Sequence, residues 1–298
     1  MSLFRNQPAD ADLPMSVADA RQLRALVREA FANAGREVTV NADHVVDDQG
    51  MQFGLWNLAA LCAHEPRKHW PALVADHVRV ISAPRVDADD LDDDQLTAMT
   101  YLRLVEAAAV PDQRWHPTAP WLGSSLRALL SIDLPDEIST PTEEIWQARG
   151  GIERWRRVGR ANIAGLAGSL ELQHGVIPLG DTGAEAHIVQ SESFLTASLA
   201  LALPELAGRY GFDLGRGALV TVPFRHQLAF FPVQPGTTSA MALDVLFRLG
   251  MSMFADSPGP LSPHVFLVRG EEWLQLTRIE DDQAHVDIDQ EVAAALGF

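Results

Sequence analysis

Cysteine is nearly absent from this sequence, since Cys62 is the only one among 298 residues. A single cysteine excludes an intramolecular disulfide framework and a cysteine-rich zinc site, and it fits a reducing compartment. Cys62 lies in a strongly apolar stretch, residues 55–63. We therefore expect a buried, inert thiol rather than a nucleophile.

Long apolar runs are also lacking. No run approaches the roughly 20 residues that are needed to span a bilayer. The beginning of the chain is interrupted by Pro8, Asp10, Asp12 and Pro14, which is unlike the apolar core of a secretory signal. We expect a cytoplasmic protein without membrane contact.

Motifs that bind nucleotides or activate a serine are missing as well. The chain contains no Walker pattern, no Gly-x-Gly-x-x-Gly and no Gly-x-Ser-x-Gly. Residues 180–183 are predicted to form a turn, and no lysine follows them as it would in a phosphate loop. We expect no cofactor and identify no catalytic residue from local motifs.

One segment resembles the zinc-protease motif, but its spacing does not fit. His64 and His69 are five residues apart, whereas the motif needs four, and Pro66 lies between them. Five helical positions turn the second side chain about 140° from the first, and proline breaks a helix interior. We expect a helix boundary with surface histidines and no metal site.

Acidic residues outnumber basic ones by 40 to 23, which gives a formal net charge of -17. This charge repels nucleic-acid phosphate and anionic lipid at long range. The expected partner is therefore another protein, with a basic surface, and no nucleic acid. The alternative is that the charge only keeps the protein soluble.

The acids are concentrated in residues 87–94, which do not match a calcium loop. Asp92 stands where an EF-hand needs glycine, and Ala98 where it needs glutamate. We predict an acidic linker at 87–97 between an N-terminal α+β lobe, 1–86, and a larger α+β domain, 98–298. The charges would also suit the approach to a helix at Leu96.

The hydrophobic patterns predict an α+β fold of short antiparallel sheets with packed helices in two lobes. Ser16 is expected to cap a helix that ends near Gly35, two short strands are expected within 37–46, and Pro71 would start another helix. Further strands are expected at 99–105 and 126–134.

A capping box predicts the start of a helix in the middle of the chain, and further helices and strands are predicted after it. Thr140, Pro141 and Glu143 suit the N-cap, first and third positions of a helix. Ser191 or Ser193 would open a helix through Leu206. In the last third, one hairpin is predicted from strands at 218–222 and 228–233, and a second from strands at 265–268 and 273–277. A helix capped by Thr237 or Thr238 is predicted between the two hairpins, and a closing helix is predicted from Asp289.

Two groups of residues are candidates for binding. Arg149, Arg156 and Arg160 would share a helix face if the helix continued through the two glycines at 150–151, with Glu153 paired to Arg157. They would form an anion-binding surface, or be neutralised by nearby acids. The second group is Arg225 and His226, expected in an exposed hairpin turn.

The order of motifs in the last third resembles a known group of proteins. The run Ala218–Pro223, the pair Arg225 and His226, the helix to Phe254 and the segment Pro260–Val268 are similar to the uncharacterised bacterial YtpQ-like family. The similarity is strongest over 170–277 and depends on order rather than on a sharp motif. It implies an α+β fold and no enzymatic activity.

Two functional hypotheses follow. The first is a binding or adaptor protein, immunity-like or chaperone-like toward a basic partner, because catalytic motifs are missing and the acidic charge is strong. The second is a hydrolase or transferase whose site assembles from distant loops, with His116, His226 and His264 as candidates. Convergence of these histidines in one cleft would favour the second.

Overall fold

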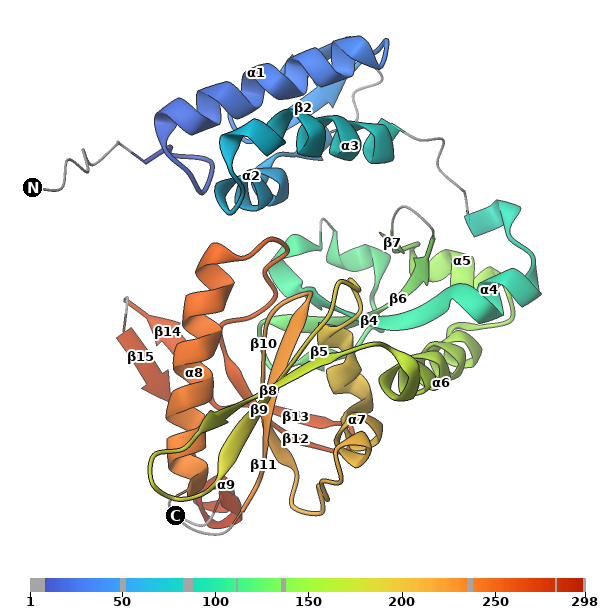
Figure 1. Ribbon diagram of the computed structural model, residues 1–298. Helices are drawn as coiled ribbons and strands as arrows, with labels where there is room; N and C mark the ends of the chain where they lie inside the picture. Colours follow the sequence, from blue (N-terminus) through green and yellow to red (C-terminus); the bar gives the residue numbers. More distant parts are fainter. Residues whose placement is uncertain are drawn as a thin grey trace, which may run out of the picture. The chain divides into compact units, whose positions relative to one another are not determined.

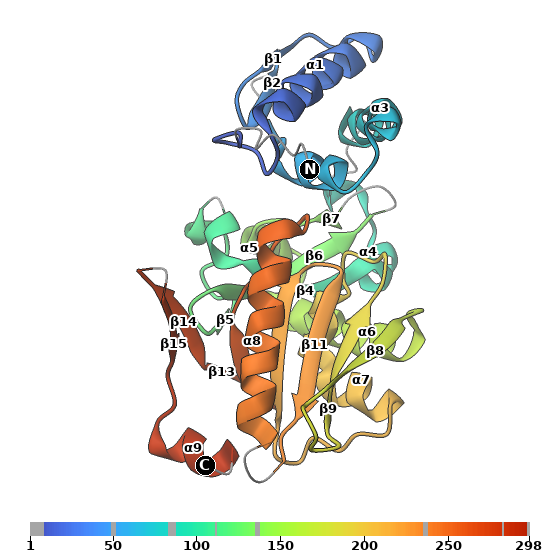
Figure 2. The same ribbon diagram turned by 60° about the vertical axis from the view of Figure 1, so that its left-hand side comes forward.

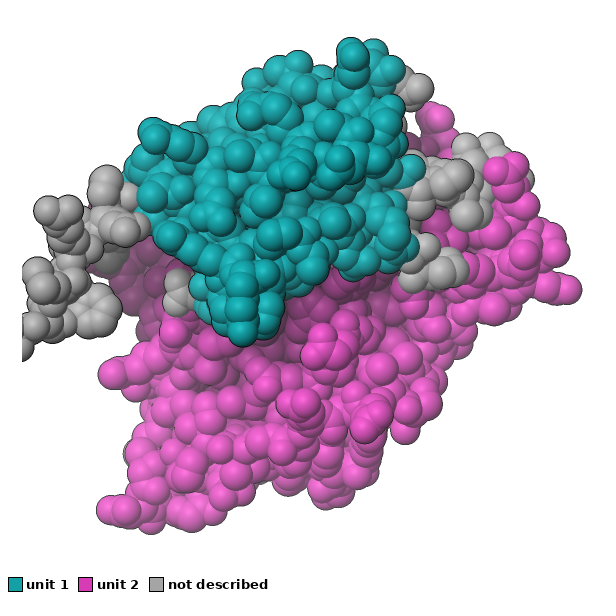
Figure 3. Space-filling view, turned by 45° about the horizontal axis from the view of Figure 1, so that its top comes forward, with its two compact units in different colours: residues 1–85, 256–259 teal, residues 86–255, 260–298 magenta. Residues whose placement is uncertain are grey.

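The computed structural model describes residues 9–48, 52–82, 88–110, 112–134, 138–234, 238–281 and 283–296. The chain divides into two compact units, which Figure 3 distinguishes by colour. Unit 1 comprises Met1–Arg85 with Asp256–Gly259, and unit 2 comprises Val86–Ala255 with Pro260–Phe298. Both contain helices and short antiparallel strands, so the predicted α+β class is confirmed.

Unit 1 combines helices with a small sheet in the order β1-β2-β3. The Ser16 side chain caps its first helix by accepting a hydrogen bond from the Asp19 N–H at 3.2 Å, as predicted. The elements are α1 (Val17–Asn33), β1 (Val38–Val40), β2 (His44–Asp47), β3 (Gln52–Gly54), α2 (Trp56–Ala63), a 3-10 turn (Arg67–His69) and α3 (Trp70–Ser82).

The core of unit 1 follows from helical spacing. Leu23, Val27 and Phe31 recur on one face of α1 and are fully buried. They belong to one apolar cluster with Val74 and Val78 of α3. The same periodicity that predicted both helices therefore selects the residues that hold them together.

Unit 2 is built around a six-stranded antiparallel sheet in the order β13-β12-β10-β11-β9-β8. Helix α8 covers one face, and α6 and α7 cover the other (Figures 1 and 2). The elements of this part are α6 (Ile152–Ser169), β8 (Gln173–Pro178), β9 (Glu185–Gln190), a 3-10 helix (Ala197–Ala202), α7 (Leu203–Arg209), β10 (Ala218–Phe224), β11 (Gln227–Pro232), α8 (Thr238–Asp256), β12 (Val265–Arg269) and β13 (Glu272–Gln275).

Both hairpins of the last third are confirmed, and their side chains divide between two cores. Val220 and Val222 pack with the α6 and α7 side of the sheet, whereas Leu219 packs with Leu243 and Leu246 of α8. Among the described residues, α8 is the one helix long and apolar enough to cross a membrane. Its buried residues lie in the core of unit 2.

A second sheet of unit 2 has the order β4-β6-β5, with β7 paired to β6. Its long strands confirm the strands predicted near 99–105 and 126–134. The elements are β4 (Thr100–Glu106), β5 (Trp121–Leu122), β6 (Leu126–Asp133), β7 (Ile138–Ser139) and α5 (Glu143–Ala148). The chain ends with the β14 (Thr277–Glu280) and β15 (Gln283–Val286) hairpin and α9 (Gln290–Leu296).

The acidic stretch predicted as a linker is part of unit 2. Its described residues form a 3-10 turn, Ala88–Asp90, and helix α4, Asp93–Met99, which Asp92 and Gln95 begin with a capping box. Leu91 and Leu96 are buried in a core cluster. The alternative, a helix at Leu96 preceded by negative charge, is therefore correct, because the apolar residues between the acids find a core. Residues 83–87 lie outside the described residues.

Two helix starts differ from the prediction. Helix α5 begins at Glu143 after Thr142, and the Thr140 hydroxyl instead contacts Ser131 Oγ at 2.9 Å. The helix expected from Ser191 or Ser193 is a 3-10 helix from Ala197 followed by α7. Thr140 is used in a contact between separate segments, whereas the Ser191 and Ser193 side chains form local hydrogen bonds within 191–196 that compete with an α-helical start.

Candidate functional site

The arginines around the two glycines do not share a helix face. Helix α5 ends before Gly150 and α6 begins after Gly151, and both glycines have left-handed φ angles, 95° and 97°. Arg149 donates hydrogen bonds to the carbonyls of Leu91 at 2.7 Å and Ala88 at 3.1 Å. It therefore fastens the acidic segment to the rest of unit 2.

Arg156 and Arg160 contact acidic side chains of unit 2. Arg156 lies 2.5 Å from Glu153 and 3.6 Å from Glu143, and Arg160 pairs with Glu271. Glu153 therefore pairs with Arg156 rather than with Arg157 as predicted. The acidic excess neutralises these arginines within the unit, and they are not brought to Arg225 and His226.

Arg225 and His226 lie at the turn between β10 and β11, and they are half-buried rather than exposed. Nε of Arg225 donates to Nε2 of His226 at 3.1 Å, so Nδ1 of His226 carries the hydrogen and donates to the Ser191 carbonyl at 3.2 Å. Burial lowers the pKa of His226, and the charge of Arg225 lowers it further. The imidazole thus acts as a neutral support for the guanidinium.

Strand β4, which carries Arg103, is linked to this turn from a distant part of the chain. The Leu104 N–H binds Ser198 Oγ at 3.0 Å, and the Ala197 N–H binds the Arg225 carbonyl at 3.0 Å. The 3-10 helix at 197–202 thereby connects β4 to the β10–β11 turn. Burial lowers the pKa of Arg225 to about 10, and the positive charge of Arg103 contributes.

A second feature of unit 2 is the tryptophan loop, which we define as residues 107–121, of which residue 111 is outside the described ones. Arg127 of β6, only 2% exposed, anchors it. Nη2 of Arg127 donates to the carbonyls of His116 at 2.5 Å and Ala119 at 3.1 Å, and Nη1 donates to Gln113. These contacts hold the loop at several points around one buried cation.

The same anchor places two tryptophans at the surface. The guanidinium of Arg127 lies 4.7 Å from the ring centroid of Trp121, and Trp115 precedes the His116 carbonyl that Arg127 binds. The side chains of Trp115 and Trp121 are 48% and 55% exposed. Trp115 has no ring contact with a described residue. The sequence offered only His116 of this region as a candidate site residue.

The catalytic candidates do not meet. His116 lies in the tryptophan loop, His226 supports Arg225, and His264 precedes β12 with its Nδ1 buried. No hydrogen bond or ring contact joins any two of them within the described ranges. Cys62 is fully buried as predicted, and burial raises the pKa of its thiol to about 11.

No group of three or more His, Cys, Asp or Glu side chains in the described part of the chain could hold a metal ion. The segment around His64 contains the predicted helix boundary, since α2 ends at Ala63 and α3 begins at Trp70. His69 contacts Glu65 at 3.0 Å.

Two other histidines form an aromatic cluster that sequence reasoning missed. Nε2 of His174 on β8 lies 3.3 Å from Nδ1 of His187 on β9. Tyr210 stacks on His174 and Phe212 packs on His187, with ring centroids 4.1 and 4.2 Å apart. The alternation of side chains along paired strands places both imidazoles on one face.

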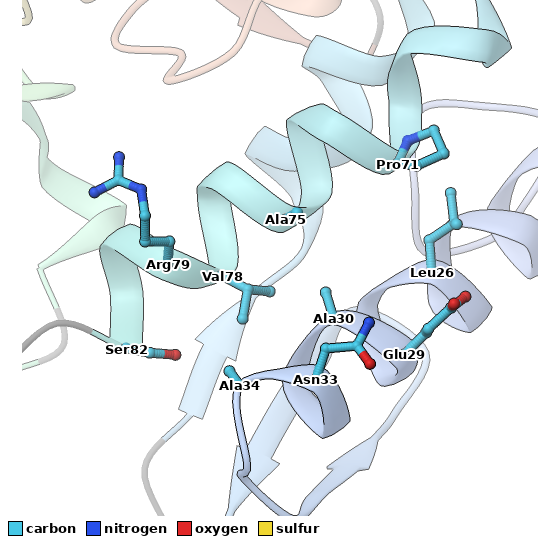
Figure 4. A pocket seen from close by; sticks show the side chains of 10 residues that line it. All are labelled: Leu26, Glu29, Ala30, Asn33, Ala34, Pro71, Ala75, Val78, Arg79 and Ser82. Atoms are coloured by element: carbon cyan, nitrogen blue, oxygen red, sulfur yellow. The ribbon is translucent and has the colours of Figure 1, made fainter.

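Unit 1 has a groove of about 670 Å³ between α1 and α3 (Figure 4). Small side chains at Ala30, Ala34 and Ala75 leave this space, and Glu29 and Arg79 add opposite charges to its lining. The Ser82 hydroxyl is buried there without a hydrogen bond to a described residue. The groove therefore combines a mainly apolar lining with a few polar groups.

Comparison of the chain with family models, curated proteins and solved structures found no match in any of the three. Membership of the YtpQ-like family stays a prediction.

Proposed function

We propose that this chain is a protein-binding module and that the tryptophan loop of unit 2 contacts a basic segment of its partner. The observation that carries the proposal is Trp115, which is 48% exposed and has no ring contact with a described residue. It belongs to a chain with a net charge of -17. An exposed indole face attracts a lysine or arginine, and the overall charge steers such a partner toward the molecule.

The construction of the loop supports this role. Ordering a flexible loop on binding costs free energy and weakens the complex. This loop is already held in place, because Arg127 donates hydrogen bonds to Gln113, His116 and Ala119. Tryptophan is also one of the side chains that contribute most to the affinity of protein interfaces. An immunity-like or chaperone-like action on a basic partner is one form of this function, carried out in the cytoplasm.

The test is a selection of peptides from a displayed random library by the full-length protein. We expect the selected peptides to be rich in lysine and arginine, with binding that weakens as salt rises from about 50 to 500 mM because the attraction is screened. Trp115→Ala should reduce the affinity of purified selected peptides by about tenfold or more, the loss typical of a binding hot spot.

The matched control is Val176→Ala, which shortens another exposed apolar side chain of unit 2, 44% exposed on β8. It should leave peptide binding unchanged. Selection of acidic or neutral peptides, or equal binding by Trp115→Ala and the original protein, would contradict the proposal.

A further inference from the structure

Two histidines at the edge of the six-stranded sheet present ring nitrogens to each other. His174 lies on β8, the outermost strand, and His187 lies on the neighbouring strand β9. Nε2 of His174 is 3.3 Å from Nδ1 of His187. In a tetrahedral zinc site with Zn–N bonds of about 2.0–2.1 Å, two ligand nitrogens lie about 3.3–3.4 Å apart. The two imidazoles are therefore already at the separation that a single metal ion requires.

Aromatic side chains hold both imidazoles in place. Tyr210 stacks on His174 with ring centroids 4.1 Å apart, and Phe212 packs on His187 at 4.2 Å. Phe230 adds a second ring contact to His187, at 5.3 Å. Ligands whose side chains are fixed by packing need little rearrangement when an ion binds. His187 is only 6% exposed, whereas His174 is exposed, so an ion can reach the two nitrogens from the side of His174.

We propose that His174 and His187 bind one divalent transition-metal ion of the zinc class, with water in the remaining coordination positions. Each imidazole ligates through an unprotonated nitrogen. Nε2 of His174 and Nδ1 of His187 therefore both give up their hydrogen to the ion's place, and each neutral ring carries its hydrogen on the other nitrogen. The ion replaces the hydrogen bond between the two rings. The site does not depend on the function proposed for the tryptophan loop.

The surroundings favour a cation and the ligands select its class. Glu185 is two residues before His187 on β9, so its exposed side chain projects from the same face of the strand. The net charge of -17 also attracts cations. Imidazole nitrogens suit zinc, copper and nickel, whereas magnesium and calcium prefer oxygen ligands. No third His, Cys, Asp or Glu completes the set among the described residues, which is why water fills the other positions.

The experiment titrates Zn²⁺ into the full chain by isothermal calorimetry, after metals have been removed with EDTA and the EDTA has been removed in turn. We expect saturable binding of one ion per chain, and no binding of Mg²⁺ over the same concentrations. X-ray absorption at the zinc edge should show two imidazole nitrogens together with oxygen ligands. A sulfur ligand, or more than two imidazoles, would place the ion elsewhere and overturn the proposal.

His174→Gln and His187→Gln should each weaken zinc binding by about 100-fold or more, because even the loss of a group that only orients a ligand costs about 10-fold to 100-fold. His69→Gln is the matched control, since His69 is an exposed histidine that contacts Glu65 at 3.0 Å. It should bind zinc like the original protein. Glu185→Gln should weaken binding by less than about tenfold, the effect of an exposed charge that is not a ligand.

A purely structural role for the two histidines makes different predictions. In that case zinc would leave the melting temperature of the original protein unchanged. Under the proposal zinc raises it for the original protein and for His69→Gln but not for His174→Gln, because a ligand that binds the native state stabilises it by mass action. His174 is exposed, so its variant gives the decisive result even where replacement of the buried His187 impairs folding. Equal zinc binding by His174→Gln and His69→Gln would overturn the proposal.

Discussion

His187 shows how its surroundings set the charge of a single side chain. It is 6% exposed, packs on Phe212 and shares a hydrogen bond with His174. Burial is the main cause that lowers the pKa of His187, His174 contributes, and Glu185 opposes the shift. The native protein therefore favours the neutral imidazole, in contrast to an unfolded chain, where histidine titrates near pH 6.5.

This difference predicts that stability falls in mild acid. The native pKa of His187 is lowered, so the unfolded chain takes up a proton at this residue more readily than the native protein. The contribution of His187 to the free energy of unfolding is therefore complete above about pH 6.5. It is lost as the pH falls below that value, by at most about 1.4 kcal/mol per pH unit. His187→Gln should reduce the slope of unfolding free energy against pH between pH 7.5 and 5, measured in urea. His69→Gln, which changes an exposed histidine, should keep the original slope. Equal slopes for both variants would rule out this role.

At the scale of elements, the contact between α6 and β4 depends on the absence of a side chain. A Cβ atom on Gly159 would lie 2.8 Å from the Leu102 nitrogen and 2.9 Å from the Tyr101 carbonyl carbon. Both are backbone atoms of β4, so the contact can be relieved only by moving the helix or the strand. The helix therefore approaches the strand more closely than any larger residue permits.

Gly159→Ala is expected to lower the free energy of unfolding by about 1–3 kcal/mol, the usual cost of overpacking. Gly165→Ala provides the comparison in the same helix, because no atom lies within 4 Å of its added Cβ. It should raise stability by up to about 1 kcal/mol, since alanine favours a helix more than glycine does. Urea unfolding of the two variants would measure both changes, and a similar effect at the two positions would show that packing on β4 is unimportant.

At the scale of the whole molecule, the excess of acidic residues acts against compactness. Ion pairs such as Arg278 with Asp287 use some of the acids, but the formal net charge remains -17. Like charges on a compact surface repel one another, and salt screens this repulsion over about 10 Å at 0.1 M. Salt also weakens the exposed ion pairs, but this costs little stability because each such pair contributes little to the free energy of unfolding.

We therefore expect the melting temperature to rise when sodium chloride is increased from about 20 to 300 mM. A double variant, Glu171→Lys with Asp181→Lys, changes two exposed acids of unit 2 and should show a smaller rise, because less repulsion is left to screen. Differential scanning calorimetry gives both values. A melting temperature that falls with salt would mean that ion pairs outweigh the repulsion.

The sequence by itself determined the features that depend on neighbouring residues. Ser16 as a helix cap, the break at Gly150 and Gly151, and the β10–β11 hairpin are local consequences of capping, left-handed φ angles and alternating side chains. The α+β class followed from them. The burial of Cys62 was predicted for the same reason, since it lies within an apolar run.

Only the tertiary structure decided which distant groups meet. It drew Leu91 and Leu96 into a core and so made an expected linker part of unit 2. It directed Thr140 to Ser131 rather than to a helix. It also linked β4 to the β10–β11 turn through the 3-10 helix at 197–202. Such contacts depend on how apolar surfaces are buried across the whole chain, and the local spacing of residues does not determine this.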